Sequence, residues 1–297
     1  MTTVRGLPLE PCVLVLKRAV FHRGGRAARM ARAGHATARR ILPAALEQAR
    51  TLAVVEEALR RRGIAFVRVP VDAIDGPVRR RLARARLVVT VGGDGTLLAA
   101  SHPVTDAAVL GVNAAPGDSV GHFCATDRRG FETWLRAIGN GDRRPVAVAR
   151  LAVTLDGRLL PELALNDVLI THQHPAATSR YRLTVGRRVE EHRSSGLWIA
   201  AAAGSTAGIR SAGGRPMRLR SRRIQFRVRE LYREPGRRYR LAAGFVGPAR
   251  PVVVESKMDE GFLFIDGARS AYRFPFGSRV EVRTALHPLR LFVRSGG

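Results

Sequence analysis

The stretch Leu87-Val-Val-Thr-Val-Gly-Gly-Asp-Gly-Thr96 decides the fold of the first half of the chain. A short β-branched run leads directly into glycines, and a helix is expected to begin at Leu97-Leu-Ala-Ala100. Glycines in such a turn let backbone N–H groups approach an anion closely, and the N-terminus of the following helix adds a favourable dipole. We therefore expect a phosphate-binding turn. The structural alternative is a plain strand–helix turn with Asp94 as the capping residue.

The carboxylate of Asp94 lies in the middle of this turn. A carboxylate beside a phosphate is electrostatically unfavourable unless it accepts a proton from an attacking hydroxyl or helps to hold Mg²⁺. The stretch is not a Walker A loop, because no Gly-Lys-Ser/Thr follows it. The turn therefore indicates phosphoryl chemistry, with Asp94 as the candidate catalytic residue.

Strands and helices are expected to alternate around the turn. The alternation spans about the first 115 residues and favours a parallel sheet covered by helices. Helical periodicity over residues 27–63 is expected to be broken by Pro43 and to end at Gly63. The other expected elements are strands over residues 11–16 and 64–69, a strand end at 110–113, and helices over residues 78–86 and 131–139.

From about Arg144 the pattern changes to short strands. The stretch from Leu151 to Leu160 predicts a hairpin with an Asp156-Gly157 turn. The succession of such strands is typical of an antiparallel β domain. We expect a parallel α/β domain over residues 1–142, an antiparallel β domain over residues 143–285, and a C-terminal segment, 286–297, that returns to the first domain. Further strands are expected at 163–171, 180–185, 188–192, 224–231, 251–255, 262–265 and 279–283.

Composition excludes several classes of protein. The chain has 297 residues, of which 45% are apolar and 25% charged, which is close to globular averages. Two cysteines, Cys12 and Cys124, cannot form a disulfide framework and lack the paired spacing of a zinc site. No apolar run reaches the ~18 residues that are needed to cross a bilayer. The first residues lack the continuous apolar core that is typical of a secretory signal. We expect a soluble protein of a reducing, cytoplasmic compartment that does not bind membranes.

The net charge is +27, and 49 of the 51 basic residues are arginines. A basic surface that attracts a polyanion is one interpretation. The other is that arginine replaces lysine for compositional reasons over a solvated surface, and this is favoured because arginines occur in every segment. Only Lys17 and Lys257 are lysines.

Two more constellations lie in the second half. Asn166 and Asp167 in Ala164-Leu-Asn-Asp-Val168 can hydrogen-bond a base edge or a ribose, although an Asn-Asp pair is often only a turn. In Ser194-Ser-Gly-Leu-Trp-Ile-Ala-Ala-Ala-Ala-Gly-Ser-Thr-Ala207, a small-residue strand meets Gly204-Ser-Thr206, which is typical of a helix N-cap with donors for a ligand. A tight strand–helix packing junction is the alternative. His172 with His174, and Cys124 near His122, are interpreted as structural.

Taken in this order, Gly92-Gly-Asp-Gly-Thr96, Asn166-Asp167, Gly204-Ser-Thr-Ala207 with Ser211-Ala-Gly-Gly214, and Ile265-Asp-Gly267 resemble the NAD kinase family. The resemblance covers roughly residues 87 to 293. It implies an N-terminal Rossmann-like domain and a C-terminal β domain, as in NAD kinases and diacylglycerol-type kinases. It further implies Mg²⁺-assisted transfer of a phosphoryl group from ATP to the adenosine ribose 2′-hydroxyl of NAD, in a homodimer or homotetramer. Another nucleoside triphosphate or polyphosphate remains open as the donor.

The resemblance also assigns residues of the first motif. It makes Asp94 the general base, with the substrate beside Gly92, Gly93, Gly95 and Thr96. No residue is assigned as a metal ligand.

In the second half, the resemblance implies that Asn166 holds the adenine side of NAD and that Arg193 lies on the phosphate side. Asp167 stands where most members have Glu, and Ser195 stands where most have an Asp that contacts nicotinamide or ribose. Thr206, Ala207 and Ser211 match the substrate-lining junction, where Gly208 replaces the usual aromatic residue. The run Ser194-Ser-Gly-Leu197 and the long loop over residues 111–122 resemble the divergent, mitochondrial-type branch of the family.

Two rival functions remain open. A lipid kinase of the same superfamily would share the first motif and could use the arginines to approach a membrane, but the Gly204 and Ser211 motifs argue against it. An arginine-rich nucleic-acid-binding protein with a vestigial kinase fold is the other, although no recognition motif for nucleic acid is evident.

Overall fold

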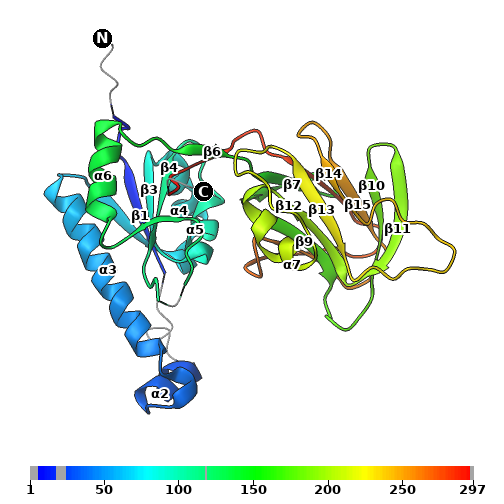
Figure 1. Cartoon of the computed structure of the whole chain (residues 1–297), viewed down its shortest axis with the longest axis horizontal. Helices are drawn as coiled ribbons and strands as arrows, with labels where there is room; N and C mark the ends of the chain where they lie inside the picture. Colours follow the sequence, from blue (N-terminus) through cyan, green and yellow to red (C-terminus); the bar gives the residue numbers. More distant parts are fainter. Residues whose placement is uncertain (1–5, 18–24, 118, 295–297) are drawn as a thin grey trace, which may run out of the picture. The chain divides into compact units, whose positions relative to one another are not determined.

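The computed structural model describes residues 6–17, 25–117 and 119–294. The chain forms two compact units (Figure 1). Unit 1 comprises Met1–Val146 together with Leu289–Gly297, and unit 2 comprises Ala147–Pro288. Residues 1–5 and 295–297, at the ends of the first and last predicted segments, lie outside the described residues.

Unit 1 is built on a parallel sheet, as the alternating pattern predicted. The strands lie in the order β2-β1-β3-β4-β19-β6, and β5 also pairs with β4. β1 pairs in parallel with both β2 and β3, and β4 pairs in parallel with β3, β5 and β19. The strand bounds are β1 Cys12–Leu16, β2 Phe66–Pro70, β3 Leu87–Gly92, β4 Ala108–Asn113, β5 Cys124–Asp127, β6 Val146–Val148 and β19 Leu289–Leu291.

Helices cover both faces of this sheet. α3 and α6 pack on one face, and α4 and α5 lie on the other (Figure 1). Among the described residues, no helix is both long and apolar enough to cross a membrane. The helices are α2 Gly25–Arg32, α3 Ile41–Arg61, α4 Gly76–Arg84, α5 Asp94–Ser101 and α6 Phe131–Asn140, with short 3-10 helices η1 Ala36–Ala38 and η2 Val71–Ala73.

The prediction that Pro43 breaks a helix is wrong. Pro43 is the third residue of α3, in the first turn, where backbone N–H groups have no helical partner and the missing donor does no harm. The interruption lies earlier, at Gly34, whose φ of 71° is left-handed and ends α2. The predicted end at Gly63 is confirmed, because this residue follows α3 with a φ of 66°.

Unit 2 consists of antiparallel sheets, as predicted. One sheet has the order β11-β10-β15-β18-β7-β8, and the other has the order β14-β13-β12-β9-β16-β17. The predicted hairpin is confirmed: β7 and β8 are joined by Asp156 and Gly157, with φ of 48° and 80°, as a tight turn between twisted strands requires.

The bounds in unit 2 are β7 Leu151–Leu155, β8 Arg158–Ala164, β9 Asp167–His172, β10 Ser179–Val185, β11 Arg188–Ser194, β12 Gly196–Ala200, β13 Ile224–Arg229, β14 Ala243–Val246, β15 Val252–Ser256, β16 Gly261–Ile265, β17 Ser270–Arg273 and β18 Arg279–Thr284, with η3 Ala203–Thr206 and α7 Gly208–Ser211.

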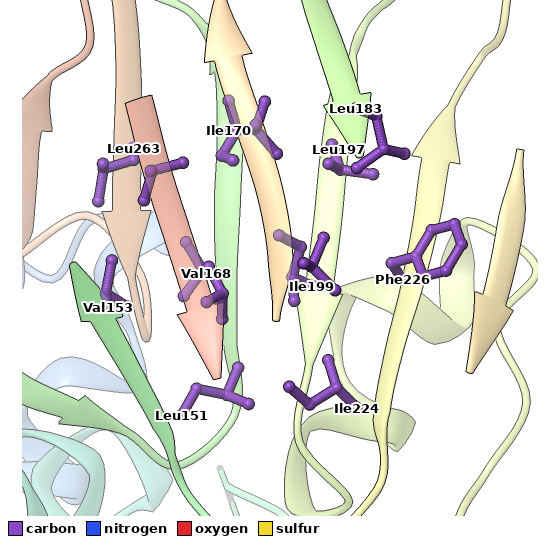
Figure 2. Packing of buried hydrophobic residues seen from close by; sticks show 14 of the residues in the cluster. Leu151, Val153, Val168, Ile170, Leu183, Leu197, Ile199, Ile224, Phe226 and Leu263 are labelled. Atoms are coloured by element: carbon purple, nitrogen blue, oxygen red, sulfur yellow. The ribbon is translucent and has the colours of Figure 1, made fainter. Parts of the chain in front are cut away.

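The core of unit 2 lies between its two sheets. Leu151 and Val153 from one sheet face Val168, Ile199 and other apolar side chains of the other sheet (Figure 2). Alternate residues along each strand point into this layer, which is the pattern of a two-sheet β domain with polar outer faces. The rigid core fixes the ends of β9, β12 and β16, where the second and third motifs lie.

Truncation of a core leucine tests this packing. Leu263 in β16 is fully buried, whereas Leu159 in β8 is 62% exposed. We expect Leu263→Ala to lower the free energy of unfolding by about 3 kcal/mol, because it removes buried apolar surface and leaves a cavity. Leu159→Ala, the same chemical change, should cost less than about 0.5 kcal/mol.

The chain has two tryptophans, Trp134 in unit 1 and Trp198 in unit 2. Urea unfolding in a Trp134→Phe background, followed by the fluorescence of Trp198, therefore reports on unit 2. Equal effects of the two leucine variants would contradict the described core.

Candidate functional site

The glycine turn lies at the carboxyl end of β3. β3 ends at Gly92, and α5 begins at Asp94. A Cβ on Gly92 would lie 2.3 Å from Oγ1 of Thr96, and a Cβ on Gly93 would lie 2.8 Å from Oγ of Ser119. A side chain at position 92 would clash with Thr96, whereas one at position 93 would require the hydroxyl of Ser119 to move. A Cβ on the exposed Gly95 would meet no atom within 4 Å, so the turn leaves open space at this position.

Asp94 does not cap its own helix, because the N-cap of α5 is Gly93. Instead its Oδ2 accepts the backbone N–H of His122 at 2.9 Å, and its Oδ1 accepts that of Phe123 at 2.8 Å. The two bonds tie the turn to the loop before β5. The carboxylate is half-buried, and each oxygen has a second lone pair available for a ligand.

A cavity of about 260 Å³ opens next to this turn. It lies at the carboxyl ends of β1, β3 and β4, against the N-terminal half of α3. Because β2 lies on one side of β1 while β3 and β4 lie on the other, the strand order reverses here. Parallel α/β sheets bind ligands in the crevice at such a point. The polar residues of the lining are Lys17, Arg40, Gln48, Asn113 and Ser119.

In unit 2, Asp266 holds the Asn166-Asp167 turn. Its Oδ2 accepts the N–H of Leu165 at 2.8 Å, and its Oδ1 accepts those of Asn166 and Asp167 at 2.8 and 3.0 Å. The N–H of Asp266 donates to the carbonyl of Asp167 at 3.0 Å. Asp266 is absent from the residues predicted for the site; its only sequence signal is the Ile265-Asp-Gly267 match.

The two polar side chains of this turn are poorly solvated. Oδ1 of Asn166 is buried and has no hydrogen-bond partner among the described residues, which is costly unless a ligand supplies an N–H donor. Asp167 is only 6% exposed. Burial raises the pKa of Asp167 to about 7, and the negative charge of Asp266 adds to the rise.

The small-residue junction packs directly on the same turn. The N–H of Ala201 donates to the carbonyl of Asn166 at 2.9 Å, and a Cβ on Gly204 would lie 2.0 Å from that oxygen. Only glycine allows this approach. The predicted N-cap is wrong: η3 has no side-chain cap, and Ser205 Oγ donates to the carbonyl of Ala202. Packing therefore explains this junction.

The predicted lining residues around the junction have different environments. Thr206 and Ser211 are exposed, and Ala207 is half-buried. At Gly208, a Cβ would lie 2.8 Å from the ring of Trp198, so the indole occupies the space beside this glycine. Strand β12 thus supplies an aromatic ring beside position 208, where this chain has a glycine.

Arg193 and Ser195 lie elsewhere in unit 2. Arg193 is exposed on the edge strand β11, with Nε 4.0 Å from Glu234. Ser195 is half-buried, and its carbonyl accepts the hydroxyl of Thr171 at 3.2 Å. Thr171 and Asp167 lie near opposite ends of β9, about 13 Å apart at ~3.3 Å per residue. The structure therefore groups Asn166 and Asp167 with Gly204 but places Ser195 at the other end of the strand.

The remaining candidates have structural surroundings. Burial raises the pKa of the Cys124 thiol to about 12, with Asp94 adding to the rise and Arg294 opposing it, so this thiol is protonated at neutral pH. Nδ1 of His172 accepts the N–H of His174, and Nε2 of His174 lies 3.7 Å from Glu260. Within the described ranges, no group of three or more His, Cys, Asp or Glu residues could hold a metal ion.

Comparison with known sequences finds relatives along most of the chain, although no protein-family model matches it. A probable NADH kinase of Oryza sativa subsp. japonica is 33% identical over 254 residues, or 78% of this chain and 77% of the relative. An NADH kinase of Arabidopsis thaliana is 34% identical over 264 residues, or 81% and 82%. An NAD kinase of Delftia acidovorans is 36% identical over 136 residues, or 43% and 44%.

Solved structures share the fold. The crystal structure of an NAD kinase from Archaeoglobus fulgidus in complex with ATP has a TM-score of 0.67 at 18% identity, covering 96% of this chain and 94% of that one. The structure of yeast NADH kinase complexed with NADH has a TM-score of 0.72 at 14% identity, covering 96% and 84%. With two relatives at 33–34% identity over about four fifths of its length, this chain belongs to the NAD kinase family.

Proposed function

We propose that this protein transfers the γ-phosphoryl group of ATP to the adenosine ribose 2′-hydroxyl of NAD or NADH. The observation that carries the proposal is the state of the Asn166-Asp167 turn: a buried amide oxygen without a partner lies beside a buried carboxyl group, in a chain of the NAD kinase family. The relatives do not favour the lipid-kinase and nucleic-acid-binding alternatives.

Asp94 is the proposed general base. A ribose hydroxyl is a poor nucleophile at neutral pH, and a positioned base contributes about 10²- to 10⁴-fold to the rate. The N–H groups of His122 and Phe123 fix the orientation of the carboxylate, and the open space at Gly95 admits a substrate beside it. The rest of the acceleration is expected from positioning and from neutralisation of the phosphoryl charge.

The Asn166-Asp167 turn is proposed to bind the adenosine end of the acceptor. The unpartnered Oδ1 of Asn166 is suited to accept the exocyclic amino group of adenine. The carboxyl group of Asp167 is suited to a ribose hydroxyl, as a donor when protonated and an acceptor when ionised. Asp266 positions both residues by binding their backbone N–H groups.

Mg²⁺ is proposed to accompany the triphosphate. The described residues offer no three-ligand cage of His, Cys, Asp or Glu. This fits a magnesium ion that takes most of its ligands from phosphate oxygens and water. Bound in this way, the ion would neutralise charge on the transferred phosphoryl group.

The proposal extends to location and assembly. Cys12 and Cys124 are buried free thiols, which supports a reducing, cytoplasmic compartment. The resemblance to NAD kinases supports a homodimer or homotetramer.

NADH is the acceptor that we expect to be preferred. The two relatives that cover about four fifths of the chain are named NADH kinase or probable NADH kinase. Ser195 also stands where most members of the family have an Asp. The nicotinamide ring is cationic in NAD and neutral in NADH, so a carboxylate beside it favours NAD and a serine removes that preference.

Replacement of Asp94 tests the general base. We expect Asp94→Asn to lower kcat by at least about 100-fold while the KM for NADH changes little, because the amide cannot accept the proton. The substitution also replaces one acceptor of the loop N–H groups, so stability must be measured alongside steady-state kinetics.

Asp127→Asn is the matched control. Oδ1 of Asp127 also accepts two backbone N–H groups, those of Arg129 at 2.9 Å and Gly130 at 3.2 Å. Asparagine keeps this oxygen, so Asp127→Asn removes the charge of a carboxylate that binds backbone N–H groups and should preserve kcat. A similar loss of kcat in both variants would assign Asp94 an anchoring role only.

The pH dependence of stability tests Asp167. Its pKa rises from an ordinary value of 3.8 to about 7 in the folded protein. The protonated carboxyl therefore favours folding below pH 4, and this stability is lost as the pH rises through 7. Relative to Asp167→Asn, the free energy of unfolding of the wild type should fall by up to about 4 kcal/mol between pH 4 and 8.

Urea unfolding followed by Trp198 fluorescence measures this difference. Asp259→Asn, at an exposed position in unit 2, is the control and should track the wild type at every pH. A constant difference between the wild type and Asp167→Asn across this range would mean that Asp167 titrates like an exposed carboxyl group.

The ratio of kcat/KM for NADH to that for NAD tests Ser195. We expect Ser195→Asp to lower this ratio by about tenfold, which corresponds to ~1.4 kcal/mol of charge interaction with the cationic ring. Ser221→Asp adds the same charge elsewhere in unit 2 and should leave the ratio unchanged. An unaltered ratio in Ser195→Asp would place this residue away from the nicotinamide.

A further inference from the structure

Unit 2 contains a cavity of about 360 Å³ that the kinase motifs do not line. Three segments of this unit surround it: the start of the unit, the loop before β13, and the end of the unit after β18. The described lining consists of Ala147, Ala149, Arg220, Arg222, Thr284, Ala285, Leu286 and Pro288. None of the site residues named above is among them.

Hydrogen bonds join the three segments. Oγ1 of Thr284 donates to the carbonyl of Arg222 at 3.0 Å, and the N–H of Ala285 donates to the carbonyl of Arg150 at 2.8 Å. The guanidinium group of Arg150, a fully buried residue, donates to the carbonyl of His287 at 3.1 Å from Nε and 2.9 Å from Nη2. The walls of the cavity are therefore fixed before any ligand binds.

The cavity is positively charged. Arg220 and Arg222 line it, and within the described ranges neither guanidinium group has a hydrogen bond or an ion pair. The described lining contains no carboxylate. Arg150, next to the lining residue Ala149, adds a third charge: burial lowers its pKa to about 10 and Asp266 opposes the shift, so it stays protonated at neutral pH. An anion would supply the partners that Arg220 and Arg222 lack.

The remaining lining residues indicate the rest of the ligand. Apart from the arginines and Thr284 the walls are apolar, and Leu286 is 90% exposed. The volume falls within the range of about 300–1,000 Å³ for pockets that enclose small molecules. Two guanidinium groups match the charge of a phosphate monoester, which each can bind through paired N–H donors. An apolar body attached to the phosphate would cover Leu286.

We propose that this cavity binds a small phosphate monoester with an apolar body. Arg220 and Arg222 are the counter-charges for the phosphate, and Leu286 is the apolar contact. The cavity shares no residue with the glycine turn or the Asn166-Asp167 turn. The inference therefore goes beyond the proposed kinase function and does not depend on it.

Calorimetric titration of the full chain with 1-naphthyl phosphate tests the two charges. We expect Arg222→Gln to raise the Kd by about tenfold or more, because a charged hydrogen bond is lost. Arg218→Gln is the matched control, since it removes an exposed arginine of the same loop that does not line the cavity. It should change the Kd by less than about twofold.

The same titration tests the apolar contact. Leu286→Ala should raise the Kd for 1-naphthyl phosphate by about fivefold or more, because less apolar surface is buried. Leu159→Ala, at another exposed leucine of unit 2, should leave it unchanged. Inorganic phosphate lacks the apolar body and 1-naphthoate lacks the second negative charge, so each should bind at least about tenfold more weakly.

Hydrogen exchange gives a second measurement on the unaltered protein. 1-Naphthyl phosphate should slow the exchange of backbone N–H groups in residues 284–287. It should not slow exchange in the hairpin turn at residues 156–157, which is remote from the cavity lining in sequence. This measurement stands even if one of the variants fails to fold.

Each other result overturns the inference. An equal Kd in the wild type, Arg222→Gln and Leu286→Ala, with no slowing of exchange, would show that the probe does not enter the cavity. Equal losses in Arg222→Gln and Arg218→Gln would reduce the effect to general surface charge. Tighter binding of 1-naphthoate than of 1-naphthyl phosphate would refute the phosphate class.

Kinase assays separate this cavity from the proposed kinase site. Arg222→Gln should keep the kcat and the KM values for ATP and NADH, because this residue belongs to neither motif of that site. A tenfold loss of kcat/KM in this variant would instead assign the cavity to substrate binding and overturn the inference.

Discussion

The hydrogen bonds between the Asp94 carboxylate and the backbone N–H groups of His122 and Phe123 constrain the rest of unit 1. They fix the loop before β5 against the glycine turn, and Ser119 of the same loop packs on Gly93. The shape of the cavity and the position of the Asp94 carboxylate both depend on this arrangement. A carboxylate held in this way has a defined orientation before any substrate arrives, which is what a general base requires.

Unit 2 uses the same device at another motif. Asp266 accepts three backbone N–H groups and so shapes the Asn166-Asp167 turn, while its charge helps to raise the pKa of Asp167. Leaving Oδ1 of Asn166 buried and without a hydrogen bond destabilises the folded state, and the packing of the surrounding β core offsets this loss. Both units therefore place a rigid turn, held by a carboxylate, at the end of well-packed strands.

Local signals in the sequence account for much of this fold. A β-branched run followed by glycines predicts β3 and α5, and Asp156-Gly157 predicts the β7–β8 hairpin. The role of Asp266 could not be predicted in this way, because its partners lie about a hundred residues earlier in the chain. The need for Gly204 likewise arises from a carbonyl oxygen 38 positions away, on Asn166.

The wrong prediction at Pro43 and the unpredicted cavity near Lys17 both concern features that local sequence patterns do not encode. Pro43 looked like a helix breaker because its place in the first turn of α3 is invisible to periodicity. The cavity near Lys17 is formed by α3 and three strand ends, which meet only in the folded sheet.

The most direct test of the account is the identity of the product. Purified protein, ATP, Mg²⁺ and NADH should yield ADP and an equal amount of a dinucleotide with one new phosphomonoester, which ³¹P NMR assigns to the 2′-oxygen of the adenosine ribose. Consumption of ATP without a new phosphate on the dinucleotide, or a phosphate at any other oxygen, would contradict the account.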